Sequence, residues 1–183
     1  MKKSILFYCA AAILFAADLD YNIGLTSSYG DSYDFYSYAE NRLNMNFFYN
    51  NLQGWIQYEY SNPPELGSPI NKLRKLRLEY EYEDWLIKFG DIYEIWGRGL
   101  ILNQLDDQGI DFDNGIRGVY LGYEKDQFAI THINGESSIW QLGNDLRKPE
   151  YVFSHKVDAL NAQYSWKNLS LGLSHLHTNE IHQ

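Results

Sequence analysis

Apolar and polar residues alternate along most of the chain with a period of two. In "KLRLEYEY", Leu76, Leu78, Tyr80 and Tyr82 alternate with charged residues. This alternation is typical of β-strands with one apolar and one polar face, and it indicates an all-β protein. The pattern predicts nine strands, at 19–29, 36–49, 52–60, 73–82, 85–93, 115–124, 127–134, 154–166 and 169–178.

The connections between these strands alternate between short and long. The short ones are two-residue turns, at Asn50-Asn51, Glu83-Asp84, Lys125-Asp126 and Lys167-Asn168. The long ones are 61–72, 94–114 and 135–153. A compact soluble domain seldom has unstructured loops of about 20 residues, whereas short turns at one end and long loops at the other are typical of outer-membrane barrels. We therefore expect an antiparallel up-and-down β-barrel of the outer-membrane type.

The two-residue turns also fix the strand register, because the residues that flank such a turn pair directly and share a face. In this register, Arg42 lies opposite Glu59, and Glu79 lies opposite Lys88. Opposite charges facing each other across a ladder are favourable. We expect the charged face to line the lumen, with these wall residues: Arg42, Glu59, Arg77, Glu79, Glu81 and Lys88.

Aromatic residues lie close to every short turn, as they do in the girdle at a membrane interface. The residues are Tyr49, Tyr82, Trp85, Tyr123, Phe128, Tyr164 and Trp166. A soluble β-sandwich with an aromatic core is the alternative, because it requires the same alternation. The choice between the two therefore depends on evidence other than the alternation.

The N-terminus, "MKKSILFYCAAAILFAADLD", combines two lysines, an apolar run and small residues. The run from Ile5 to Phe15 is too short to span a bilayer, so we predict a secretory signal peptide at 1–17 and a barrel domain at 18–183. Cleavage would leave no cysteine and would change the net charge from −9 to −9 − 2 = −11. Such a charge disfavours binding to nucleic acid. The export signal, the loop asymmetry and the missing cysteines favour the barrel over the sandwich.

The predicted strand number is odd, whereas single-chain bacterial barrels have even numbers. We therefore expect about nine strands from the N-terminal part of a larger barrel, truncated at the C-terminus. The alternative is that one strand is miscounted and that eight strands close a small barrel.

The segment "GDIYEIWGRGLILNQLDD" resembles a nucleotide loop only in its glycines. It lacks the lysine-hydroxyl pair of a P-loop and the dinucleotide-binding spacing. The aspartate-rich segment that follows lacks the order of a calcium loop, and His175 and His177 have no further metal ligands in the sequence. No catalytic triad has a signature here, so we predict no enzyme, no cofactor and no metal.

We expect this segment to form a constriction at the mouth of the barrel. Gly97 and Gly99 would let the backbone bend where the strand ends. At least one Arg–Asp pair would then fold the loop inward over the lumen. The candidate residues are Arg98, Asp106, Asp107, Asp111, Asp113 and Arg117.

The motifs "GDIYEIWGRGLILN" and "GIDFDNGIRGVYL" resemble a family of exported proteins of unknown function, which are predicted outer-membrane barrels of Gram-negative bacteria. The matching positions are Gly90, Asp91, Tyr93, Trp96, Gly97, Gly99, Leu100, Ile110, Asp111, Asn114, Arg117 and Gly118. This chain has Phe112-Asp113 as an insertion relative to the family's Ile-Asp-Asn spacing. The resemblance implies location and fold, but no reaction.

The predicted function is an outer-membrane pore or transport-associated protein with a polar lumen of mixed charge, which selects by width and wall charge. Its partners would be outer-membrane lipid and the barrel-assembly machinery, with an unknown permeant. One alternative is a non-conducting surface-binding barrel, with Trp96 and Trp140 stacking on a glycan. The other is a barrel enzyme or a soluble exported carbohydrate-active or carbohydrate-binding β-domain.

Overall fold

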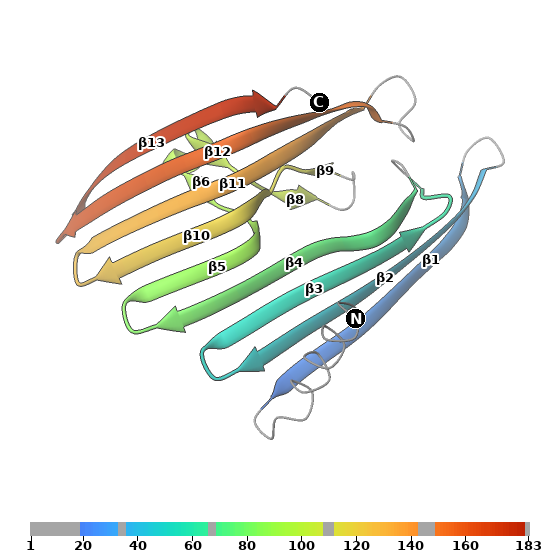
Figure 1. Cartoon of the computed structure of the whole chain (residues 1–183), viewed down its shortest axis with the longest axis horizontal. Coiled ribbons are helices and arrows are strands. Elements are labelled where there is room, and N and C mark those ends of the chain that lie inside the picture. Colours follow the sequence, from blue (N-terminus) through green and yellow to red (C-terminus); the bar gives the residue numbers. More distant parts are fainter. Residues whose placement is uncertain (1–18, 33–35, 66–68, 108–111, 143–148, 182–183) are drawn as a thin grey trace, which may run out of the picture.

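A computed structural model describes residues 19–32, 36–65, 69–107, 112–142 and 149–181, with the backbone alone for 32, 36, 140–142 and 149–152. The predicted signal peptide lies outside the described residues. The nine long strands form one antiparallel sheet in sequence order, β1 to β5 and then β10 to β13 (Figure 1). They are β1 (Asp20–Ser32), β2 (Tyr36–Tyr49), β3 (Leu52–Ser61), β4 (Ile70–Tyr82), β5 (Trp85–Ile92), β10 (Ile116–Lys125), β11 (Phe128–Leu142), β12 (Pro149–Trp166) and β13 (Leu169–Ile181).

The predicted all-β antiparallel class is confirmed, and each expected strand is present. Within the described residues, β1 and β13 are the two outer strands of an open sheet. No described segment forms a helix of the length and apolar character needed to cross a membrane.

The tight turns gather at one end of the sheet, at the lower left of Figure 1. Each begins with a residue at positive φ, which are Asn50, Glu83, Asp126 and Lys167. Positive φ lets the turn match the right-handed twist of its strands. The third turn is Asp126-Gln127, one residue later than expected, because Lys125 pairs with Phe128.

The predicted register is confirmed in the β2–β3 and β4–β5 hairpins, since Arg42 pairs with Glu59 and Glu79 pairs with Lys88. In the β10–β11 hairpin the register differs from the prediction, because the turn is displaced by one residue. Several strands extend further than expected: β1 ends at Ser32, β4 begins at Ile70 and β13 ends at Ile181, while β11 ends at Leu142 and β12 begins at Pro149. The alternation is interrupted in the extended part of β11, "NGESSIWQL". Pairing with β12 keeps this part in the sheet.

The sheet has two different faces, which follow from the alternation. The apolar face carries most of the large exposed side chains of the strands, including Ile23, Leu25, Leu43, Tyr80, Phe89, Leu121, Leu171 and Leu173. The polar face carries the buried polar side chains Gln57, Glu59, Ser61 and Lys75. Most soluble proteins bury apolar residues and expose charges, so burial is inverted in this sheet.

A β-bulge in β4 changes the polar face locally. Gln57 pairs with Lys75, whereas the next residue, Tyr58, pairs with Leu73, so Arg74 is an extra residue between them. Both Arg74 and Lys75 then contact acidic groups on the polar side. A bulge therefore places two adjacent cations on the same face.

The segment 93–115, called the excursion below, folds onto the polar face. It contains β6 (Ile95–Trp96), η1 (Gly97–Gly99), β7 (Leu102–Asn103), β8 (Asp106–Asp107) and β9 (Phe112–Asp113). In Figure 1, β6 lies behind β12, and β8 and β9 lie at the end opposite the tight turns. Trp96 and Leu102 form the core together with Ile116, Ile133 and Val157. The excursion therefore covers an apolar area of the polar face, over β10 to β12.

Candidate functional site

A buried lysine joins the excursion to the sheet. Lys75 is 0 % exposed, and its ammonium group contacts Asp113 directly and lies 3.2 Å from Asp106. The same group donates a hydrogen bond of 2.5 Å to the Tyr93 hydroxyl, which donates in turn to Asp113 at 3.0 Å. We call Lys75, Tyr93, Asp106 and Asp113 the Lys75 cluster. One cation of the sheet thus binds three side chains of the excursion.

The protonation of this cluster follows from its burial and charge. Burial alone would raise the pKa of Asp113, but hydrogen bonds from Lys75, the Gly115 amide and Tyr93 hold it below its ordinary value. Burial raises the pKa of Tyr93, and the negative charges of Asp113 and Asp106 raise it further. At neutral pH the tyrosine therefore stays protonated, and Asp113 stays ionised.

We expect the attachment of the excursion to be insensitive to pH until strongly acidic conditions. The lowered pKa of Asp113 contributes stability above the unfolded-state pKa of about 3.9, which is lost as the pH falls through the lower folded value. A nitroxide at Leu100→Cys, in a Cys9→Ser background, should report constant mobility from pH 8 to about 5 and release below about 4. The Asp113→Asn variant should be mobile already at pH 7. A mobility step between pH 5 and 8 would contradict this assignment.

A second contact also ties the excursion to the sheet. The Lys88 ammonium lies 3.0 Å from the Glu94 carboxylate and 4.5 Å from the centre of the Tyr120 ring. Glu79 pairs with Lys88 in the ladder, but its carboxylate lies 2.9 Å from Arg77. Lys88 thus binds the excursion, whereas Arg77 binds a neighbouring acid of the sheet.

A third group of charges lies on β2, β3 and β4. The buried Glu59 carboxylate lies 2.7 Å from Arg74 and 3.5 Å from Arg42. Arg42 also lies 3.3 Å from Glu40. Charges of both signs therefore compensate one another along the wall. This is the mixed-charge polar surface that the alternation predicts.

Asp91 and Arg117 stabilise the end of β5 beside the bulge. The Arg117 guanidinium donates to both carboxylate oxygens of Asp91, at 2.9 and 3.1 Å. Asp91 also accepts a hydrogen bond from the Leu76 amide, and Arg117 donates to the Arg74 carbonyl. The Asp91–Arg117 pair therefore satisfies backbone groups of the bulged β4, and bidentate pairs of this kind are among the strong ones.

The loop residues expected to form a constriction differ in their partners and their exposure. Arg117 pairs with Asp91 rather than with an aspartate of the excursion. Arg98 is exposed at a φ of 57° and forms no ion pair with any described residue. Asp106 and Asp113 bind Lys75, while Asp107 pairs with Phe112 in a short ladder. Asp111 lies outside the described residues.

Of the two tryptophans considered for glycan stacking, Trp96 is not open to a ligand. Trp96 is 7 % exposed, because its indole packs into the core beneath the excursion. The ring lies in one buried cluster with Ile116 and Ile133, which are apolar residues on the otherwise polar face. The side chain of Trp140 lies outside the described residues.

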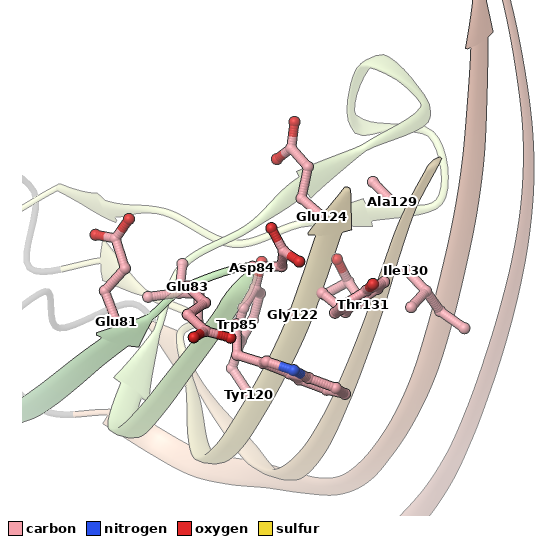
Figure 2. Close-up of a pocket in the computed structure, with 12 residues that line it drawn as sticks. Glu81, Glu83, Asp84, Trp85, Tyr120, Gly122, Glu124, Ala129, Ile130 and Thr131 are labelled. Carbon is pink, nitrogen blue, oxygen red and sulfur yellow. The ribbon is translucent and has the colours of Figure 1, made fainter. Parts of the chain in front are cut away.

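A shallow hollow of about 340 Å3 lies at the end with the tight turns. Figure 2 shows the carboxylates of Glu81, Glu83, Asp84 and Glu124 around it, together with Trp85. Asp84 is also 3.4 Å from Lys125. Nowhere in the described ranges are three or more His, Cys, Asp or Glu side chains arranged to hold a metal ion.

Sequence reasoning did not identify Lys75, Tyr93 or Glu94 as parts of the site. Lys75 is one of several lysines and arginines in an alternating strand, and only the bulge and the folded excursion distinguish it. Tyr93 appears in the motif "GDIY", and Asp106 and Asp113 were expected in the loop, but nothing in the sequence connected them with Lys75. The contacts between the sheet and the excursion connect residues up to 38 positions apart, as with Lys75 and Asp113.

The model of one protein family matches most of the chain. Its description is "Family of unknown function (DUF6029)", and the match covers residues 17–179. No curated protein and no solved structure matches the chain. The description gives no location, so the outer-membrane assignment stays a prediction.

Proposed function

We propose that this chain, which belongs to the family of unknown function DUF6029, forms the wall of an outer-membrane β-barrel. Its function would be that of a pore or transport-associated protein, with the polar face turned toward a lumen of mixed charge. Outer-membrane lipid would cover the apolar face, and barrel-assembly machinery would insert the chain. Selection would depend on lumen width and wall charge.

The inverted burial of the sheet is the observation that carries this proposal. Large apolar side chains such as Phe89, Leu121 and Leu173 are exposed on one face, while Glu59 and Lys75 are buried on the other. Contiguous exposed apolar surface of this kind marks a membrane or protein contact. The aromatic residues beside the tight turns agree with an interfacial girdle, and Trp85 and Tyr123 pack together there at 4.7 Å.

The excursion supports a narrowed lumen rather than a wide one. Its core contacts cover the polar face of β10 to β12, and the Lys75 cluster fixes it to β4. The polar face of β1 to β3 carries none of these core residues. The proposal is therefore a pore whose cross-section is reduced on one side.

A charge on the apolar face should prevent insertion, whereas the same charge on the polar face should not. Leu121→Arg places a guanidinium on the apolar face of β10, which would be the lipid side, at a cost of about 2–4 kcal/mol near the bilayer midplane. Gln163→Arg, on the polar face of β12, is the matched control. The measurement is the fraction of chain that inserts into vesicles and shows heat-modifiable gel mobility. Equal insertion of both variants would contradict the assignment of the faces.

Conductance distinguishes a pore from a non-conducting barrel. The chain, once shown to be inserted, should give small discrete conductance steps in a planar bilayer. Inserted chain without conductance would overturn the pore and leave a surface-binding barrel. Full solubility without detergent would overturn the membrane assignment altogether and favour a soluble carbohydrate-binding domain.

A further inference from the structure

Two neighbouring aromatic side chains, Phe48 of β2 and Trp55 of β3, lie on the polar face outside the core that the excursion covers. Phe48 is 47 % exposed, and Trp55 is partly exposed. Phe48 pairs with Gln53, and Trp55 pairs with Asn46, so the two rings are diagonal neighbours on one face. Every other exposed large apolar side chain described in β1 to β5 lies on the apolar face. Neither the core nor a lipid contact explains these two rings.

Side-chain amides surround the two rings on the same face. By register they are Asn22, Asn44, Asn46, Gln53 and Gln57. An amide both donates and accepts hydrogen bonds, and therefore suits a ligand rich in hydroxyl groups. The structure uses only some of this capacity, because Gln57 donates to Asn44 at 2.9 Å and Gln53 donates to Glu79 at 2.6 Å.

The charges next to the rings compensate each other. The Arg77 guanidinium lies 5.6 Å from the centre of the Trp55 ring, close enough to restrain it by a cation–π contact. The same guanidinium lies 2.9 Å from the Glu79 carboxylate. The surface beside Trp55 therefore carries a positive and a negative group in contact. A neutral ligand fits this surface better than an acidic or a basic one.

We propose that Phe48 and Trp55, framed by the amides of β1 to β3, form a binding site for a neutral oligosaccharide. The apolar C–H faces of sugar rings pack on aromatic rings, while the hydroxyl groups exchange hydrogen bonds with the amides. The diagonal placement of the rings lets them contact successive sugar units. The inference rests on the proposed function in one respect, since it names the class of permeant that the lumen would accept. Binding itself requires only the folded sheet.

The test titrates the full chain in detergent with neutral malto-, cello-, manno- and chito-oligosaccharides. Calorimetry measures the binding of each series. At least one of these series should bind, and binding should increase with chain length up to a few units. Trp55→Ala should weaken binding about tenfold or more, and Phe48→Ala should also weaken it. Trp166→Ala, on the apolar face, is the matched control and should bind as the wild type does. Heat-modifiable mobility shows for each variant that the sheet is folded.

The outcomes separate this proposal from that of the pore. If no neutral series binds the folded chain, or if folded Trp55→Ala binds as well as the wild type, the sugar site is wrong. Tighter binding of acidic galacturonate oligomers than of neutral ones would overturn the neutral class. Sugar binding without conductance in a bilayer would overturn the pore alone. Conductance without sugar binding would overturn the sugar site alone.

Discussion

Replacing Lys75 with methionine should release the excursion from the wall of the sheet. Methionine keeps much of the volume of the buried side chain but removes the charge that Asp106, Asp113 and Tyr93 share. Removing one partner of a buried ion pair leaves the others uncompensated, which costs about 3–5 kcal/mol. We expect about 3 kcal/mol, because the Asp113 side chain is 34 % exposed.

Two measurements check this result. Limited proteolysis should cut Lys75→Met within 93–115 far faster than the wild type. In the proposed pore, the single-channel conductance of this variant should also be larger, because the excursion would no longer narrow the lumen. Lys72→Met is the control, since Lys72 is an exposed lysine of the same strand. Equal cleavage and equal conductance in the two variants would show that Lys75 does not hold the excursion.

Replacing Gly90 with alanine should disrupt the junction of β4 and β5. Gly90 has a φ of 100°, and an added Cβ would lie 1.9 Å from the Leu76 carbonyl oxygen. The backbone conformation alone costs about 1–3 kcal/mol for a residue with a side chain, and the clash with backbone atoms adds to it. We expect almost complete loss of heat-modifiable, protease-resistant protein.

Gly24→Ala is the matched control for this change. Gly24 also lies on the polar face of a strand, but nothing lies within 4 Å of the position of its Cβ. This variant should fold to the same extent as the wild type. A folded, stable Gly90→Ala protein would contradict the described backbone at the β4–β5 junction.

The sequence alone was enough to predict the sheet. Short turns restrict the register to one choice, and a slip of one residue would exchange the faces. The pairing of Arg42 with Glu59 therefore followed from the turn at Asn50. Local alternation and turn chemistry act over a few residues, and both are visible in a linear sequence.

The site was predicted less well, because its contacts are not local. The alternation treats Lys75 as one more wall residue, yet the bulge at Arg74 and the distant Asp113 make it the attachment point of the excursion. Trp96 lies in a predicted loop without periodicity, so nothing in the sequence indicated its burial. At least one pair between Arg98 or Arg117 and a loop aspartate was expected, but Arg117 pairs with Asp91, which lies directly opposite it in the ladder.

The pairing of Ile92 with Ile116 has a consequence for how a sheet of this kind can vary between related proteins. These residues are ladder partners, so the excursion leaves the sheet and returns to it at the same rung. Its length and composition can therefore change without altering the order or the register of the nine strands. The excursion is thus an insert that can vary while the sheet around it stays the same. Related proteins can therefore share the nine-stranded sheet and differ in this one insert.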